Sequence, residues 1–268
     1  VDPDMAVDVN KRMAEFEKLV ERTHKAGLKV VIDFVPNHVA REYHSISCPN
    51  GIEDLGASDN KDWHFSTSNN FYYCWGHPFA PQFDIEHDSD GNPLPPYAEQ
   101  PAKATGNDVF SASPSKNDWY ETVKLNYGID YCDAGGRSEH FYDSEGKPIV
   151  DTWFKMTEIL LFWASKGVDA FRCDMAEMVP AAFWHYATEE VKAIYPWITF
   201  IGEVYDPSQY RNYIAAGFDY LYDKVGMYDT VRAVTCGHCS TQEITRQWQA
   251  TDDIKDNMLY FLENHDEQ

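Results

Sequence analysis

Residues 151–174 read DTWFKMTEILLFWASKGVDAFRCD, and this stretch carries the pattern that decides the fold. Asp151 is a good N-cap residue, and the apolar side chains after it recur at helical spacing: Trp153, Phe154, Met156, Ile159, Leu160 and Trp163. Gly167 stands where a glycine commonly terminates a helix, and Val168 to Cys173 are apolar enough for a buried strand. The stretch therefore predicts a helix that leads directly into a strand.

The same helix–strand unit recurs on both sides of this stretch. Upstream, residues 10–26 have the spacing of an amphipathic helix, Gly27 follows, and residues 28–35 form a nearly continuous apolar run typical of a strand buried on both faces. Downstream we expect a helix at 180–195, a strand at 198–204, a helix at 208–215, a strand at 218–222, helical stretches within 224–253 and a strand at 258–262. Such repeated units predict a parallel α/β sheet, either doubly wound or closed as a barrel.

Between residues 39 and 150 this alternation stops. The stretch is rich in Pro, Gly, Asn, Ser, Tyr and Trp, and structureless loops of such length are rare in compact domains. We therefore expect an inserted subdomain at 39–150 between two parts of one α/β unit, at 1–38 and 151–268. Most of its aromatic side chains should form a small core, and a minority could offer flat faces to sugar rings.

The composition narrows the function classes. The 268 residues include 22 Lys and Arg against 44 Asp and Glu, a formal net charge of −22, so we expect neither nucleic acid nor an anionic membrane as a partner. No apolar run approaches the roughly 18 residues that span a bilayer, which excludes membrane insertion. Six cysteines are too few for a disulfide-stapled scaffold of this length. Because Val1 rather than Met opens the chain, we expect a piece of a longer protein, and its localisation stays open.

Polar side chains cluster at the C-terminal ends of four predicted strands, where parallel sheets and barrels place their chemistry. The clusters are Asp33 with Asn37 and His38, Arg172 with Asp174, Glu203 alone, and the run Glu263-Asn264-His265-Asp266. A single acid at a strand end is often only a helix cap. Three or more carboxylates, two histidines and an arginine at corresponding strand ends, however, predict one shared site.

Paired carboxylates in such a site, without a phosphate-binding loop, a dinucleotide fingerprint or an HExxH motif, point to glycoside cleavage. That reaction needs one acid to protonate the leaving oxygen and one carboxylate to attack or shield the anomeric carbon. Apolar neighbours suit Glu203 to be the acid, and Arg172, on the same strand face, suits Asp174 to be the nucleophile. Hydrolysis by a metal ion held by Asp and His is the competing interpretation.

The four motifs together resemble glycoside hydrolase family 13, the α-amylase family. The motifs occur in the order of the family's four signature regions: Asp33 to His38, Phe171-Arg172-Cys173-Asp174, Gly202-Glu203-Val204 and Asn264-His265-Asp266. The resemblance implies a (β/α)8 barrel with a subdomain inserted after the third strand, and a retaining mechanism on α-glucans such as starch, glycogen or maltooligosaccharides. It also implies that strands one, two and eight are missing, so we expect the isolated chain to be poorly soluble or inactive.

The resemblance assigns roles to six site residues. The catalytic ones would be Asp174 as nucleophile, Glu203 as general acid/base and Asp266 as the third carboxylate, which helps to hold and distort the sugar. The substrate-binding ones would be His38, Arg172 and His265, with Arg172 also orienting the nucleophile. Asp33 and Asn37 would be structural.

Two positions depart from the family's pattern. Many α-amylases have Lys-His where this chain has Glu177-Met178, which weakens the inference to ordinary α-amylase specificity on the leaving-group side. Where the family often has Pro-Asp-Leu-Asn, residues 123–126 read VKLN, so Lys124 replaces an acidic ligand of the usual calcium ion. An ammonium group cannot coordinate calcium, so we expect no metal or other cofactor there. Lys124 would instead bond Asn37, unless it points into solvent.

Several alternatives stay open. A transglycosylase of the same family would pass the glycosyl group to a second sugar instead of water, and a carbohydrate-binding derivative or an inactive fragment would keep the motifs without turnover. The run Cys236-Gly237-His238-Cys239 has the spacing of a thiol–disulfide oxidoreductase motif. Because no strand–helix context can be assigned to it, a loop disulfide, a metal site and coincidence compete with redox catalysis.

Overall fold

The computed structural model describes residues 3–45, 51–87 and 90–267 of the chain. The chain divides into two compact units, residues 1–34 with 156–268 and residues 35–155. The predicted insertion, 39–150, lies within the second unit. Val1 and Cys48 lie outside the described residues.

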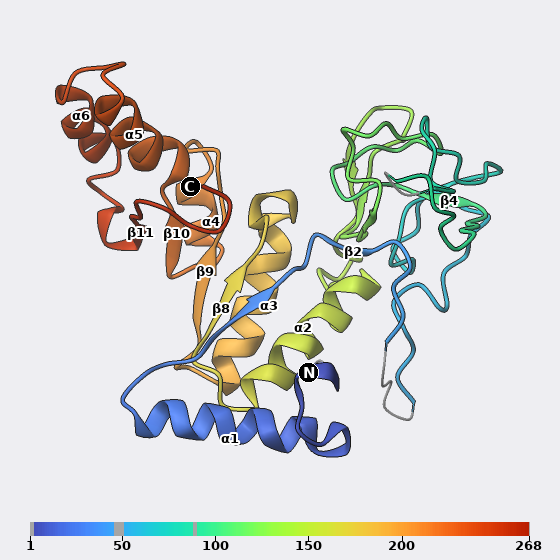
Figure 1. Cartoon of the computed structure of the whole chain (residues 1–268), viewed down its shortest axis with the longest axis horizontal. Helices are drawn as coiled ribbons and strands as arrows, with labels where there is room; N and C mark the ends of the chain where they lie inside the picture. The colour runs from blue at the N-terminus through green and yellow to red at the C-terminus, as the bar shows by residue number, and fades with distance from the viewer. Residues whose placement is uncertain (1–2, 46–50, 88–89, 268) are drawn as a thin grey trace. The chain divides into compact units, whose positions relative to one another are not determined.

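The first unit is built on a five-stranded parallel sheet in the order β1-β8-β9-β10-β11 (Figure 1). The strands are β1 (Val31–Phe34), β8 (Ala170–Cys173), β9 (Thr199–Gly202), β10 (Tyr220–Tyr222) and β11 (Met258–Leu259). Their sequence order equals their spatial order, and helices connect them, as repeated βα units require. The prediction of a parallel α/β sheet is confirmed.

Helices separate these strands at the predicted places. They are α1 (Arg12–Lys25), α2 (Asp151–Ala164), α3 (Ala181–Ile194), α4 (Tyr210–Ala215), α5 (Asp229–Thr235) and α6 (Gln242–Ala250), with a π-helical turn at Lys224–Tyr228 and 3₁₀ turns at Pro3–Met5, Val9–Lys11, Ala176–Met178 and Lys255–Asn257. Gly27 follows α1 with φ +78°, and Gly167 follows α2 with φ +87°, the left-handed conformation that glycine adopts at low cost. None of the described helices combines the length and the apolar character needed to cross a membrane.

The two outer strands differ from their predictions. Residues 28–35 were expected to form a strand buried on both faces, but β1 spans only Val31–Phe34 and Val31 is 49% exposed. Within the sheet of the described residues β1 pairs only with β8, so its other edge and part of its surface stay open. The strand predicted at 258–262 ends at Leu259, and Leu262 is 80% exposed. Both predictions were too long because an apolar run does not reveal where strand pairing ends.

A core of large aromatic side chains supports the central strands. Phe171 of β8 and Phe200 of β9 are fully buried, and their ring centroids lie 5.7 Å apart. Trp184 of α3, also fully buried, packs its ring 4.8 Å from that of Phe218. Each such side chain contributes on the order of 2–3 kcal/mol through burial, which makes the ends of β8 and β9 a rigid platform.

The second unit contains three short antiparallel pairs rather than a larger sheet among its described residues. They are β2 (His38–Ala40) with β5 (Thr122–Lys124), β3 (Tyr73–Cys74) with β4 (Ala102–Lys103), and β6 (Ile129–Asp130) with β7 (Ser138–Glu139). Tyr72, 1% exposed, contacts the rings of Phe110 and Tyr131 and is the centre of an aromatic core. Trp63 and Trp75, by contrast, are 60% and 65% exposed.

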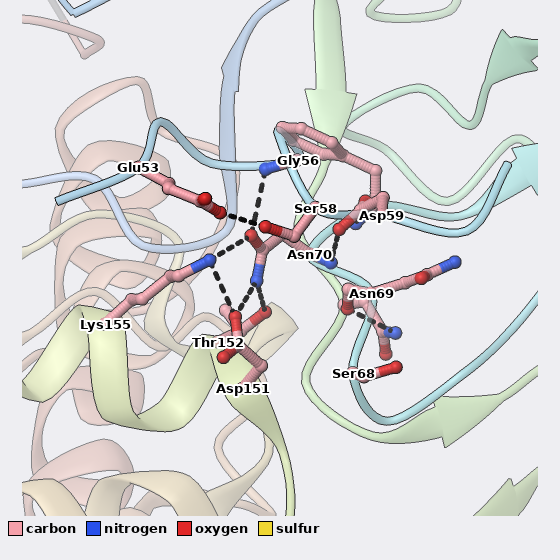
Figure 2. A network of polar contacts seen from close by, with 12 residues as sticks. Glu53, Gly56, Ser58, Asp59, Ser68, Asn69, Asn70, Asp151, Thr152 and Lys155 are labelled. Atoms are coloured by element: carbon pink, nitrogen blue, oxygen red, sulfur yellow. Dashed lines mark hydrogen bonds and ion pairs between the residues drawn. The ribbon is translucent and has the colours of Figure 1, made fainter. Parts of the chain in front are cut away.

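A buried polar network joins the loop around residue 56 to the start of α2 within the second unit (Figure 2). Asn70, which has no exposed surface, donates to the Asp151 carboxylate at 2.7 Å. The side-chain oxygen of Asn70, Oδ1, accepts from the Gly56 backbone N–H and from the Lys155 ammonium, both at 2.9 Å. Because Lys155 also pairs with Asp151 at 2.8 Å, these partly exposed charges are compensated and the network is structural.

Candidate active site

The register of the sheet brings Asp174 and Glu203 together. Cys173 of β8 pairs with Gly202 of β9, and each acid is the next residue of its chain. The Asp174 N–H donates to the Phe34 carbonyl at 2.9 Å, and the Glu203 N–H donates to the Cys173 carbonyl at 3.1 Å. Adjacent strands lie about 4.8 Å apart, so the two acids leave neighbouring strand ends side by side.

The Arg172 guanidinium group connects the acids. Its Nη1 lies 2.7 Å from Asp174 Oδ1 and 3.2 Å from Asp33 Oδ1, and its Nη2 lies 3.0 Å from Glu203 Oε2. Burial alone would lower the pKa of Arg172, but Glu203, Asp174, Tyr222 and Asp33 outweigh it and raise that pKa. The group is therefore a permanent cation shared by the predicted nucleophile and the predicted acid/base.

Glu203 is held at both of its carboxylate oxygens. The side chain is 3% exposed, Oε1 accepts from the Tyr205 hydroxyl at 2.6 Å, and Oε2 accepts from the Met175 N–H at 2.8 Å. The expectation of apolar surroundings for this carboxyl group was wrong. Alternate residues of a strand face opposite sides, so the apolar Phe200 and Val204 project away from Glu203.

Met175, directly after the predicted nucleophile, has an unusual backbone conformation. Its φ is +44°, in the left-handed region that residues other than glycine rarely occupy. Such a conformation costs on the order of 1–3 kcal/mol and persists where the surrounding structure imposes it. Here it accompanies the hydrogen bond from the Met175 N–H to Glu203. A short strained turn thus ties the end of β8 to the acid at the end of β9.

Asp266 and His265 follow β11 in the same unit. Their side chains are 51% and 64% exposed, and His265 Nε2 lies 3.1 Å from Asp266 Oδ2. The Asn264 side-chain oxygen accepts the Asp266 N–H at 2.9 Å and shapes this turn. The pKa of Tyr205 is raised by burial, by its hydrogen bond to Glu203, and by the negative charges of Glu203 and Asp266. Asp266 therefore lies within electrostatic range of the hydroxyl that holds Glu203.

His38, the remaining predicted site residue, is described within the second unit. It pairs with Lys124 in the β2–β5 ladder, and its ring packs against Trp119 with the centroids 5.4 Å apart. Its Nδ1 lies 3.1 Å from the side-chain nitrogen of Asn37. These contacts fix the orientation of the imidazole ring.

Lys124 is buried and bonded in the way that the sequence predicted, not directed into solvent. The residue is 2% exposed, and its ammonium group donates to Asn37 Oδ1 at 2.6 Å and pairs with Asp108 at 2.7 Å. Asn37 in turn donates to the Gly106 carbonyl at 2.8 Å. Burial lowers the pKa of Lys124, and Asp108 opposes that shift.

These residues do not fit the calcium ion that the family resemblance implies. A cation already lies between the oxygens of Asn37 and Asp108, and an ammonium group cannot serve as a ligand. Within the described parts of the chain no group of three or more His, Cys, Asp or Glu residues is arranged to hold a metal ion. We propose that Lys124 takes the place of the ion in joining β5 to Asn37 and Asp108.

The stability of the protein should therefore be independent of calcium and dependent on Lys124. We expect no change in the unfolding midpoint on addition of a chelator, and a loss of about 3 kcal/mol in Lys124→Met, because that change leaves a partly buried charge uncompensated. Lys147→Met, which removes a 72% exposed ammonium group, is the matched control and should be neutral. Chelator-induced destabilisation of the unchanged protein, reversed by calcium, would contradict this account.

The sequence did not predict several contacts of the site. Two residues donate hydrogen bonds to Glu203: Tyr205 and Met175. Glu177 accepts from the backbone that follows Glu203, and the Tyr222 ring packs against Arg172. Tyr205 could have been found, because it lies two residues after Glu203 and so shares its strand face. The contact of the Met175 backbone N–H could not have been found, because a methionine in the sequence does not indicate a left-handed backbone conformation.

The Cys236–Cys239 segment lacks the setting of a redox motif. Cys236 follows α5 as its C-cap residue and is exposed, whereas thiols of low pKa lie at helix N-termini. The described cysteines, Cys74, Cys132, Cys173, Cys236 and Cys239, are all free thiols. Burial raises the pKa of Cys173, which makes this thiol inert.

Comparison with known proteins gives a consistent family match. Residues 11–127 match the family model described as alpha amylase, catalytic domain. An alpha-1,4-glucan:maltose-1-phosphate maltosyltransferase of Cereibacter sphaeroides is 32% identical over 66 residues, which cover 25% of this chain and 11% of the relative. An alpha-glucosidase of Candida albicans is 24% identical over 254 residues, 94% of this chain and 37% of the relative. The human amino acid transporter heavy chain SLC3A1 is 24% identical over 229 residues, which cover 82% of this chain and 25% of the relative.

Solved structures extend the likeness to nearly the whole chain. The alpha-amylase of Lactobacillus plantarum matches with a TM-score of 0.56 and 22% identity over 95% of this chain and 46% of that one. The maltogenic amylase of S. marinus matches with a TM-score of 0.57 and 18% identity, over 94% of this chain and 33% of that one. The chain thus spans less than half the length of these relatives. Its five-stranded parallel sheet is part of a (β/α)8 barrel, and the family-model match over residues 11–127 supports glycoside hydrolase family 13, the α-amylase family.

Proposed function

We propose that the protein is a retaining glycoside hydrolase that cleaves α-glucosidic bonds of starch, glycogen or maltooligosaccharides. The observation that carries the proposal is the sharing of one guanidinium group by two acids at adjacent strand ends, Asp174 at 2.7 Å and Glu203 at 3.0 Å. In retaining enzymes the two catalytic carboxyl groups lie about 5–5.5 Å apart. Adjacent strands lie about 4.8 Å apart, so acids at neighbouring strand ends are compatible with this spacing.

The reaction would proceed in two displacements. Asp174, kept in position by Arg172, attacks the anomeric carbon while Glu203 gives its proton to the glycosidic oxygen, so the bond from that carbon to the leaving sugar breaks. A water molecule then gives a proton to Glu203 and attacks the same carbon, which releases Asp174. Asp266 would hold the distorted sugar, and His265 would bind its hydroxyl groups.

The stereochemistry of the product tests this proposal. The full-length protein is incubated with maltooligosaccharides, and the anomeric protons of the fresh product are followed by NMR before mutarotation. Two inversions at one carbon predict that the α-anomer forms first. Initial formation of the β-anomer would show inversion and overturn the assignment of Asp174 as nucleophile.

Transfer to a second sugar is the alternative outcome of the same intermediate. The maltosyltransferase among the relatives favours it, whereas the alpha-glucosidase favours hydrolysis. The two reactions are distinguished by products longer than the substrate, whose yield should rise with substrate concentration only if transfer dominates.

A role without turnover is the second candidate. It is favoured by the match to the transporter heavy chain, which extends over 82% of this chain. Against it stand the complete set of three predicted carboxylates and the bonding of Glu203 at both oxygens. Binding of maltooligosaccharides without any product would favour this candidate.

A further inference from the structure

Glu177 makes an unexpected contact in the first unit. It lies in the 3₁₀ turn Ala176–Met178, three residues after Asp174. One carboxylate oxygen, Oε2, accepts the backbone N–H groups of both Tyr205 and Asp206 at 2.9 Å. These residues directly follow Glu203 and Val204, the first two residues after β9, so Glu177 anchors the segment that leads away from the predicted acid/base. Two hydrogen bonds to an ionised oxygen are stronger than two neutral ones.

The turn that carries Glu177 is itself fixed. The Tyr213 hydroxyl, from α4, lies 2.9 Å from the Glu177 carbonyl oxygen and 3.0 Å from the Val179 carbonyl oxygen. Tyr213 is 4% exposed, and the Trp184 indole of α3 donates to the Ala176 carbonyl at 3.0 Å. The turn that carries the anchor is therefore held by side chains of both α3 and α4.

The anchored segment acts on Glu203 through Tyr205. The Tyr205 hydroxyl donates to Glu203 Oε1 at 2.6 Å, a short and therefore direction-sensitive bond. Its pKa is raised, first by burial and then by the hydrogen bond to Glu203, so the hydroxyl keeps its proton and stays a donor at every working pH. The segment after β8 thus makes two hydrogen-bonded contacts with the segment after β9. The Met175 N–H donates to Glu203, and the Glu177 carboxylate accepts from the Tyr205 N–H.

We propose that Glu177 is a positioning residue for the general acid/base: it fixes the backbone of Tyr205, whose hydroxyl sets the direction of the Glu203 carboxyl group. This inference rests on the proposed function. It also gives a physical meaning to the departure from Lys-His at this point of the sequence. The carboxylate of Glu177 is turned onto the backbone of its own unit, so this chain uses the position to orient its acid/base.

The test compares three variants of the full-length protein on two substrates. Glu177→Ala removes the anchor, Tyr205→Phe removes only the final hydrogen bond, and Glu177→Gln keeps an oxygen that can accept both N–H groups. The substrates are a maltooligosaccharide, whose leaving sugar needs a proton, and α-maltosyl fluoride, whose leaving group does not. A urea unfolding curve of each variant separates loss of fold from loss of positioning.

We expect Glu177→Ala and Tyr205→Phe to lower kcat on the maltooligosaccharide about 10²-fold with little change in KM, since a misplaced catalytic group slows the chemical step. The rate at which α-maltosyl fluoride glycosylates Asp174 should be nearly unaffected in these variants. Glu177→Gln should retain most of the activity on the maltooligosaccharide. Because both residues act along one path, the double variant should be no slower than the slower single variant. Equal losses on both substrates, additive losses, or an active Glu177→Ala protein would overturn the inference.

A crystal structure of Glu177→Ala gives a readout that does not depend on activity. The inference predicts that the distance from the Tyr205 hydroxyl to Glu203 Oε1 lengthens beyond 3.5 Å, the limit of a hydrogen bond. An unchanged Tyr205–Glu203 contact would refute it even in a protein without turnover. An unchanged protein that turns over neither substrate would instead contradict the proposed function.

Discussion

Asp174→Asn should abolish turnover of maltooligosaccharides, with a loss of roughly 10⁴-fold or more in kcat, the scale seen when a covalent nucleophile is removed. An amide oxygen can still accept from Arg172 Nη1, now 2.7 Å from the Asp174 carboxylate, so the fold and the binding of substrate should persist. The measurement combines steady-state kinetics with calorimetric binding of a maltooligosaccharide.

Asp256→Asn is the matched control for this change. It removes the same charge from an exposed position in the 3₁₀ turn Lys255–Asn257, and it should leave kcat and binding unchanged. Rates near those of the unchanged protein in Asp174→Asn would refute the two-displacement mechanism. Loss of binding together with turnover would show that Asp174 acts on substrate affinity instead.

Glu203→Gln should lower kcat on maltooligosaccharides by about 10²–10⁴-fold, because the glycosidic oxygen would leave without a proton. On α-maltosyl fluoride the first step needs no acid, so a burst of fluoride is expected, followed by slow release of the sugar. Azide, a nucleophile that needs no base, should accelerate that release and yield an α-linked glycosyl azide.

Glu190→Gln, at an exposed position of α3, is the matched control and should have no effect. A Glu203→Gln variant equally slow on both substrates and indifferent to azide would remove Glu203 from the acid/base role. Formation of the β-linked azide would contradict retention.

Much of the fold could be predicted because its signal is local. The helix α1 and the run from α2 through β8 follow from apolar spacing and from Gly27 and Gly167, whose left-handed conformation the structure confirms. The extent of the outer strands could not be predicted, because it depends on pairing: among the described residues β1 pairs with β8 alone, and β11 ends after Leu259. The second unit, with strands of two or three residues, has almost no periodic signal.

The site divides in the same way. That Asp174, Arg172 and Glu203 meet follows from their positions at the ends of adjacent strands, and the register confirms it. The environment of Glu203 was predicted wrongly, because its neighbours in sequence face the opposite side of the strand. The anchoring of Tyr205 by Glu177 depends on a turn conformation that no residue pattern indicates.

Trapping of the glycosyl-enzyme intermediate tests the central claim most directly. A 5-fluoro glycosyl fluoride slows both displacements but keeps a good leaving group, so the covalent intermediate should accumulate. Mass spectrometry of the digested full-length protein should then find one added glycosyl unit on the peptide that contains Asp174, and none in Asp174→Asn. A label on a different residue, or turnover with no label at all, would contradict the account.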